Sequence, residues 1–408
     1  MKQALMILGV ALAAFAARVA LSPAAPAGAA ERLVTALPTP PMSASEAEQT
    51  ERDIALYTAR AAADPLGAAD RSKLAELYLA RARSTGNVRD AERAERAARE
   101  SLALRDAHNS RTRQLLASSL LAQHRFVEAL HVAGRLAASN PDVATFRALF
   151  GECQLEVGDY AGADTTFQSL ARNAGSLAIA PRVARWHELS GRTPAARRLL
   201  AWARDEARRS AAGLTGEQRA WFELRVGDLD LRHRRLAAAE SSFRAGLAAN
   251  PGDYRVLGAL ARLELARGNP RAAIDAGEAA ITVTLDPATL GVLADAYAIT
   301  GDSATVRQYV TALSAAVLQQ PGAYHRAWSL WLLDHDLEVT RVSSKVREEL
   351  RSRRDVYGLD LHAWALHKQG RHEEASAVMR QVLARGIDDP MLAEHARKIA
   401  AAIERGSR

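Results

Sequence analysis

Histidine and acidic side chains are the residues of this chain best suited to catalysis or metal binding, and eleven histidines are present. His187 precedes Glu188, as in the helix of zinc proteases, but no second histidine completes that motif. His362 and His367 are five residues apart, a spacing that separates side chains around a helix. The run Asp-His-Asp at 334–336 could hold a cation, but we interpret it as a polar turn.

Other signatures of catalysis are also missing from the sequence. It contains no glycine-rich phosphate loop and no Gly-x-Ser-x-Gly nucleophile elbow. Cys153 is the only cysteine, which excludes an intrachain disulfide and a cysteine zinc cluster, and we expect it to be a small buried group. We therefore predict a protein that is not an enzyme and holds no metal and no cofactor.

Composition and charge indicate a helical protein without a strong preference for polyanions. Alanine, leucine and arginine dominate, and aromatic residues make up only 5% of the chain. The formal net charge is +7, but acidic residues are interspersed among the basic ones. Residues 182–235 are the exception, with thirteen arginines against seven acidic residues. This stretch is either a basic patch or an arginine-rich solvated helix surface, and the second interpretation is the more common one.

The N-terminal residues 1–29 have the features of a secretory signal. Lys2 precedes an apolar run, and small residues around Ala29 provide a cleavage site. The run is shorter than the roughly 20 residues that a spanning helix needs, so we expect a periplasmic or secreted protein without stable membrane insertion. An uncleaved signal that anchors the chain in the inner membrane is the alternative. The proline- and alanine-rich residues 30–50 are expected to form a flexible linker before a folded domain at 51–408.

The folded part is organised as a repeated pair of helices. Residues 146–170 read as a helix, a tight turn at Gly158 and a second helix. Gly151 is small where the two helices must approach closely, and Phe167 is bulky where the space beside them must be filled. Similar turns recur about 34 residues apart and are expected at Gly86, Gly158, Gly191, Gly268, Gly301 and Gly370.

This recurring register resembles the tetratricopeptide repeat, a family of helical hairpins. The resemblance implies an all-α fold, a right-handed α-solenoid of about nine hairpins between Leu74 and Val382, with a capping helix at 391–403. The unit at 74–104 has longer helices than the family norm, and a degenerate unit is expected at 324–354. Members of this family usually bind a peptide or helix of another protein along the inner wall of the solenoid.

Carried onto this sequence, the resemblance implies a groove of the following residues: Glu152, Arg185, Glu188, Trp221, Asp228, Arg232, Arg262, Asp295, Tyr357, Asp360, Trp364, His367 and Lys368. Trp221 and Trp364 are the expected anchors, because a partly exposed indole often carries much of the binding energy. The alternative is that each packs on its neighbouring hairpin. The mixed charges favour a protein partner over nucleic acid. A subunit or assembly factor that uses the outer face remains the alternative function, and the sequence leaves the oligomeric state open.

Overall fold

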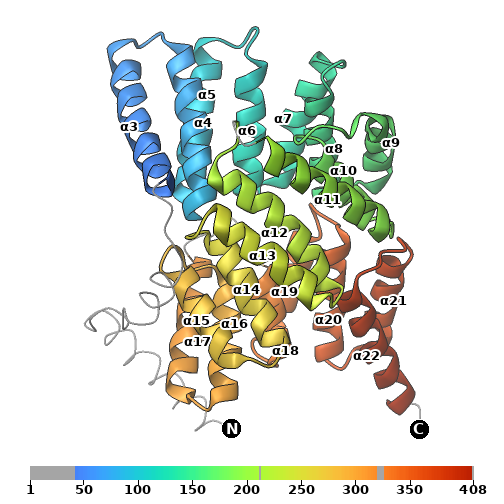
Figure 1. Cartoon of the computed structure of the whole chain (residues 1–408). Coiled ribbons are helices and arrows are strands. Elements are labelled where there is room, and N and C mark those ends of the chain that lie inside the picture. Colours follow the sequence, from blue (N-terminus) through green and yellow to red (C-terminus); the bar gives the residue numbers. More distant parts are fainter. Residues whose placement is uncertain (1–41, 211–212, 319–325, 407–408) are drawn as a thin grey trace.

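The computed structural model describes residues 42–210, 213–318 and 326–406. Within these ranges the chain forms twenty α-helices, a short 3-10 turn and no strand (Figure 1). Helix α3 (Met42–Ala63) comes first, nine antiparallel hairpins follow, and helix α22 (Pro390–Gly406) ends the array. The nine hairpins and the terminal helix confirm the predicted all-α solenoid.

The nine hairpins pair each odd-numbered helix with the even-numbered helix before it. The first helices of the pairs are α4 (Ala68–Thr85), α6 (Ser110–Ala122), α8 (Ala144–Val157), α10 (Ala180–Glu188), α12 (Gly216–Arg232), α14 (Tyr254–Ala266), α16 (Pro287–Thr300), α18 (Arg326–Asp334) and α20 (Val356–Lys368). The second helices are α5 (Val88–Leu104), α7 (Phe126–Ser139), α9 (Tyr160–Leu170), α11 (Thr193–Arg209), α13 (Leu236–Ala249), α15 (Pro270–Ile281), α17 (Ser303–Leu318), α19 (Val339–Glu349) and α21 (His372–Leu383).

Helix α3 occupies part of the region that we expected to be a linker. It begins at Met42, directly after Pro41, the last residue of the proline-rich run. Residues 44–50 are mostly good helix formers, and Ile54 is buried against the following hairpin. The linker prediction for 30–50 is therefore wrong from Met42 onward, while the predicted signal at 1–29 and the linker at 30–41 lie outside the described residues.

The hairpin turns share one backbone feature, a residue with left-handed φ. These residues are Gly86, His124, Gly158, Gly191, Arg234, Gly268, Gly301, Asp336 and Gly370. Six are the glycines that mark turns in the sequence, and the other three stand where the repeat lacks a glycine. A side chain with Cβ is disfavoured in this conformation, which explains why glycine recurs there with the period of the repeat.

Complementary side chains hold the two helices of each hairpin together. Phe243 of α13 is fully buried and lies against Gly227 of α12, where a Cβ atom would come within 2.4 Å of the ring. Phe167 of α9 lies in the same way against Gly151 of α8, at 2.8 Å. The two pairs confirm that small and bulky residues alternate across the helix contacts, as close packing requires.

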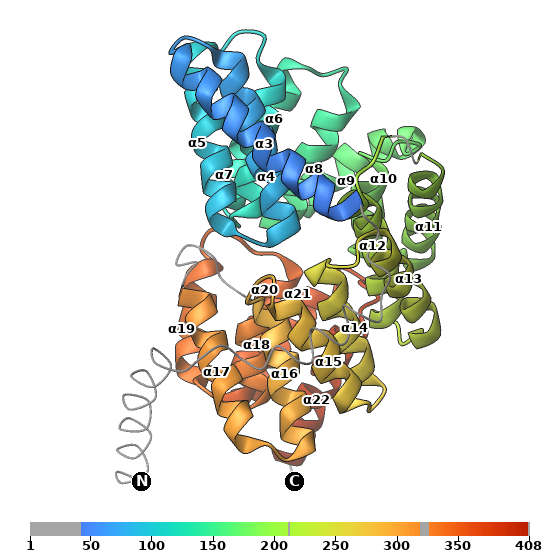
Figure 2. The ribbon, with the colours of Figure 1, turned by 60° about the vertical axis from the view of Figure 1, so that its left-hand side comes forward.

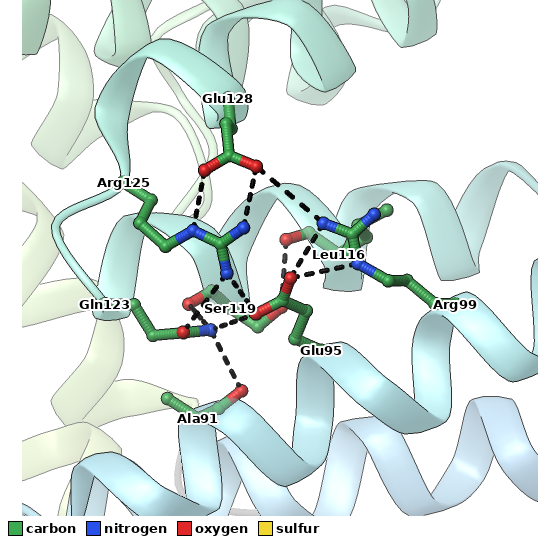
Figure 3. Close-up of polar contacts among 8 residues, drawn as sticks. All are labelled: Ala91, Glu95, Arg99, Leu116, Ser119, Gln123, Arg125 and Glu128. Atoms are coloured by element: carbon green, nitrogen blue, oxygen red, sulfur yellow. Dashed lines mark hydrogen bonds and ion pairs between the residues drawn. The ribbon is translucent and has the colours of Figure 1, made fainter. Parts of the chain in front are cut away.

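Polar networks connect successive hairpins, as the one around Glu95 of α5 illustrates (Figure 3). Its carboxylate accepts hydrogen bonds from Arg99 at 2.7 Å, from Gln123 at 2.8 Å and from Arg125 at 2.6 Å. Arg125 also pairs with Glu128 of α7 at 2.7 Å. Burial alone would raise the pKa of Glu95, but these donors outweigh burial and lower the pKa. The network therefore joins the first hairpin to the second through charged groups that each have partners.

The winding brings distant parts of the chain into contact. In Figures 1 and 2 the later helices α20 and α21 lie below the earlier helices α8–α10. Arg353, which precedes α20, donates to the carbonyl of Glu156 at 2.6 Å across 197 residues of sequence. Arg385, which follows α21, pairs with Asp164 of α9 at 2.9 Å across 221 residues. The solenoid thus closes on itself after one turn of its superhelix, because hairpins of the second superhelical turn contact hairpins of the first. In an open array each unit touches only its neighbours.

Backbone and apolar contacts reinforce this closure. A Cβ at Gly191 would lie 2.0 Å from the carbonyl oxygen of Gly386. The backbones of the two superhelical turns therefore approach too closely at this point for any side chain. One continuous apolar cluster includes Phe167 and Trp186 of the earlier turn together with Met379 and Leu392 of the later one. The inner surface of the solenoid is therefore bounded by two turns that are packed against each other.

Backbone strain at the turns can be tested by reciprocal substitutions. Gly268→Ala is expected to lower the free energy of unfolding by about 1–2 kcal/mol, because Gly268 has a φ of 80°. Nothing lies within 4 Å of the added Cβ, so the loss would come from the backbone alone. Arg234→Gly relieves the same strain and is expected to stabilise only slightly, because the greater freedom of glycine in the unfolded chain offsets part of the gain. Urea unfolding followed by circular dichroism measures both, and equal midpoints for wild type and both variants would contradict the explanation.

Candidate functional site

A pocket of about 730 Å³ opens on the inner surface of the solenoid. Helices α8, α10 and α12 form one side, and α18, α20 and the start of α22 form the other. Its polar and indole side chains are Arg182, Arg185, Arg225, Arg232, Arg326, Glu152, Glu156, Asp389, Tyr357 and Trp221. Because the two sides come from helices that only the closure brings together, the pocket depends on the contact between turns.

The carboxylate of Glu188, at the end of α10, organises the basic side of this pocket. Its oxygens lie 3.3 Å from a guanidinium nitrogen of Arg185, 3.3 Å from one of Arg225 and 3.1 Å from one of Arg232. Glu188 itself is almost completely buried. Burial opposes ionisation of Glu188, but the three guanidinium groups outweigh burial and lower its pKa. One negative charge thus holds three positive charges at the pocket wall.

On the opposite side of the pocket, the ring of Tyr357 makes contacts with two arginines. The guanidinium of Arg326 lies 3.9 Å from the ring centroid of Tyr357, and that of Arg185 lies 5.2 Å from it. Distances of this size are typical of cation–π contacts. The Tyr357 hydroxyl donates to Asp389 at 3.2 Å. Tyr357 therefore lies between arginines that reach it from α10 and from α18.

The acidic residues of the pocket each have a partner of their own. Glu152 accepts from Arg182 at 2.7 Å. Glu156 lies 3.4 Å from Arg353 across the turn contact, and burial raises its pKa in spite of the nearby arginines. Asp389 accepts from Tyr357 and caps the first turn of α22. Glu152 and Glu156 are thus engaged by arginines, whereas Asp389 keeps its negative charge in the pocket, because its side-chain partner is a neutral hydroxyl.

The structure brings six of the thirteen predicted groove residues together at this pocket. Five line it, namely Glu152, Arg185, Trp221, Arg232 and Tyr357, and Glu188 lies directly behind three of its arginines. Trp221 is half-buried, and its ring meets that of Phe222 edge to face at a centroid distance of 5.0 Å. Trp221 is therefore partly exposed, and its role as an anchor stays a prediction.

Three of the predicted groove residues, Asp228, Arg262 and Asp295, lie elsewhere along the solenoid. Asp228 and Arg262 pair with each other at 3.0 Å on consecutive first helices. Asp295 accepts from the indole nitrogen of Trp331 at 2.9 Å and pairs with His335 at 3.0 Å. Each of these groups has a partner within the chain, and none of the three lines the pocket at Glu188.

The last four predicted residues, Asp360, Trp364, His367 and Lys368, form a separate cluster in which Trp364 is buried. Its ring stacks with those of His395 and His367 at centroid distances of 4.2 and 4.8 Å, and its nitrogen donates to Asp334 at 2.9 Å. The expectation of a partly exposed Trp364 is therefore wrong, because the capping helix α22 covers this indole. Asp360 is also fully buried, where it binds His395 at 2.8 Å. Lys368 pairs with Asp336 at 2.9 Å.

The nearby histidine pair does not extend into a larger ligand set. His367 and His372 approach each other with 3.1 Å between their Nδ1 atoms. In the part of the chain that the structure describes, no group of three or more histidine, cysteine or acidic residues is placed to hold a metal ion. Cys153 is fully buried, as predicted, and burial raises the pKa of its thiol.

Sequence reasoning missed five polar residues of the pocket, namely Glu156, Arg182, Arg225, Arg326 and Asp389. Arg225 lies on the same helical face as Trp221 and Arg232, at i+4 from the tryptophan, so the periodicity of α12 could have identified it. Arg326 and Asp389 had no such signal, because they reach the pocket only through the turn contact. The arginines of the basic stretch 182–235 do not form one patch. Four of them line the pocket, while others form ion pairs elsewhere, as Arg208 does with Glu223.

The role of Glu188 can be tested by removing its charge. Glu188→Gln leaves three guanidinium groups close together in a mostly buried site, so we expect a loss of about 3–5 kcal/mol in the free energy of unfolding. Added salt should recover part of that loss by screening the repulsion. The control is Asp228→Asn, which breaks a partly exposed pair and should cost less than about 1 kcal/mol. A Glu188→Gln loss as small as that of the control would contradict the assignment.

The titration of His367 gives a prediction on pH. Burial lowers its pKa to about 4, with His372, Lys368, His395 and Arg405 acting in the same direction. Histidine in an unfolded chain titrates near pH 6.5, so the unfolded state binds the proton first and stability falls between about pH 6.5 and 4. Thermal unfolding at pH 7 and 4.5 should show a smaller loss on acidification in His367→Gln than in wild type. The exposed control His131→Gln should keep the wild-type loss.

No transmembrane candidate occurs among the described helices, because none is both long and apolar enough to cross a bilayer. A scan of the sequence against known protein families finds no match. A comparison with curated proteins finds none either.

Similar chains do occur among solved structures. The Cut9–Hcn1 hetero-tetramer of the APC/C is similar at 13% identity and a TM-score of 0.47, over 76% of this chain and 59% of that one. The chain thus spans less than two thirds of the length of that relative. Human IFIT1 is similar at 16% identity and a TM-score of 0.49, over 73% and 70%. A tetratricopeptide-repeat protein from Parabacteroides merdae is similar at 14% identity and a TM-score of 0.36, over 71% and 98%.

At identities this low, the hairpins of the chain itself are the better guide to its fold. Nine antiparallel helix pairs follow one another, most of their left-handed turn residues stand 33 to 35 residues apart, and small residues face bulky ones across the helix contacts. Because these are the period and packing of the tetratricopeptide repeat, the chain has the fold of that family.

Proposed function

We propose that this chain is a non-catalytic scaffold for protein–protein interaction in the cell envelope, and that it holds a peptide or helix of a partner protein against its inner wall. The observation that supports this most is the half-buried Trp221 at the wall of a 730 Å³ pocket. A large aromatic side chain in a hollow is a common centre of binding energy. The signal predicted at 1–29 supports the location in the envelope.

The chemistry of the pocket favours a peptide over a simple polyanion. Leu155, Pro181 and Met391 provide apolar wall beside the arginines. Ligand pockets commonly have volumes of about 300–1,000 Å³, so this one could hold a few side chains of a partner. The carboxylates of Glu152 and Asp389, one on each side of the pocket, would repel a nucleic-acid backbone, which brings one charge with every phosphate.

The proposal is tested by removing the indole. Once a partner has been captured from the native envelope fraction and identified by mass spectrometry, Trp221→Ala should weaken its binding by about 30-fold, as expected when roughly 2 kcal/mol is lost. Titration calorimetry on the purified pair measures the change.

The matched control is Trp202→Ala, which truncates a half-buried indole that does not line the pocket. It should leave the affinity unchanged. If instead both variants bind the partner as tightly as wild type, the inner wall is not the binding surface, and a contact through the outer face would replace it. Circular dichroism of each variant confirms that the array remains folded.

A further inference from the structure

The arginines of the pocket outnumber the negative charges that the chain supplies to them. Arg185, Arg225 and Arg232 share the single carboxylate of Glu188, at 3.1 to 3.3 Å. Glu152 and Glu156 pair with Arg182 and Arg353, and Asp389 accepts from the neutral hydroxyl of Tyr357. Guanidinium groups stay charged in proteins, so a surplus that is mostly withdrawn from solvent favours the binding of a negative group from outside.

Arg326 adds a fourth cation from the opposite side. Its carboxylate neighbour, Asp360, lies 4.0 Å away and is already bound to His395 at 2.8 Å. The guanidinium lies instead over the ring of Tyr357 at 3.9 Å. Its planar face is therefore packed on an aromatic ring, and its ion pair is a long one, at 4.0 Å from the Asp360 oxygen that His395 does not bind.

The geometry points to a carboxylate-binding site: we propose that this pocket recognises an acidic peptide segment of the partner through the arginines of α12 and α18. The carboxylate would come from an aspartate or glutamate side chain or from the end of the partner chain. Arginine suits this ligand, because its fork of donors matches the two oxygens of a carboxylate. This inference rests on the proposed function, since it names the chemistry of the partner at the same site.

The number of charges argues for one or two carboxylates in place of a longer polyanion. Five arginines line the pocket, against three carboxylates in its lining and that of Glu188 behind it, which leaves a surplus of one positive charge. The indole of Trp221 and the apolar side chain of Leu155 line the same hollow. An acidic residue next to an apolar or aromatic one would therefore satisfy both kinds of wall.

The site also differs from a groove formed by neighbouring hairpins alone. Arg225 and Arg232 come from α12, whereas Arg326 and Tyr357 come from helices more than ninety residues later in the chain. The contacts of Gly191 with Gly386 and of Arg385 with Asp164 hold these parts together. Binding of a carboxylate would bridge cations on both sides and would thus stabilise the closed winding.

The test uses the full chain and three synthetic peptides, each with an acetylated N-terminus. The first is Ac-Gly-Leu-Glu-Trp-Glu with a free C-terminal carboxylate, the second is its C-terminal amide, and the third has both glutamates replaced by glutamine and ends in an amide. Titration calorimetry at low salt should show binding of the first that weakens at least tenfold for the third. The amide arm distinguishes the two sources of the carboxylate. If the amide of the acidic peptide binds as weakly as the glutamine peptide, the chain end supplies the carboxylate; if it binds like the free acid, the glutamate side chains do.

Variants of the pocket complete the test. The double variant Arg225→Gln/Arg232→Gln should weaken binding of the acidic peptide at least tenfold. It is expected to fold, because Arg185 remains to pair with Glu188 and repulsion is removed. Arg225→Lys keeps the charge, loses the fork of donors and should have an intermediate effect. The charge-matched control Arg271→Gln, at an exposed site outside the pocket, should bind like wild type.

Equal binding of the acidic and glutamine peptides, no binding of the acidic peptide at millimolar concentration, or full binding by the folded double variant would each overturn the carboxylate site. The captured partner separates this inference from the proposed function. A partner that depends on Trp221 but is indifferent to the double variant would retain the scaffold and remove the carboxylate site. Acidic-peptide binding that depends on the arginines, with a partner indifferent to Trp221→Ala, would do the reverse.

Discussion

Contact between two turns of the solenoid is the constraint on which the inner surface depends. Arrays of helical hairpins are held together mainly by neighbours, so their curvature is set by the small rotation between units. Here Arg353 and Arg385 reach across about 200 residues of sequence to Glu156 and Asp164, and one apolar cluster continues through both turns. The closure converts an open groove into a pocket with two walls.

Charge is arranged around that closure in a consistent way. Around Glu95 arginines and acids are equal in number, because Arg99 and Arg125 pair with Glu95 and Glu128. At the pocket, by contrast, three arginines share Glu188, and Arg326 packs on Tyr357. The inner pocket thus gathers several arginines around few carboxylates.

The local features of the fold could be predicted from the sequence because neighbouring residues determine them. Gly268 and the other turn glycines repeat with the period of the hairpins, and the pairing of Gly151 with Phe167 follows from the packing of one hairpin. The closure could not be predicted from the sequence, because it depends on small rotations between neighbouring hairpins that add up over many units. Arg326 and Asp389 were missed for that reason. Trp364 was misplaced because the capping helix brings His395 over its ring, and the start of α3 was missed because composition alone does not separate a linker from a surface helix.

Hydrogen exchange of the chain with and without its captured partner tests the central claim most directly, namely that the pocket between the turns is the binding surface. The amides of α10, α12 and α20 should exchange more slowly in the complex, together with those around Gly191 and Gly386, because the partner would join both walls. Protection confined to the second helices of the hairpins, such as α11, α13 and α15, with no change at α10, α12 and α20, would contradict it.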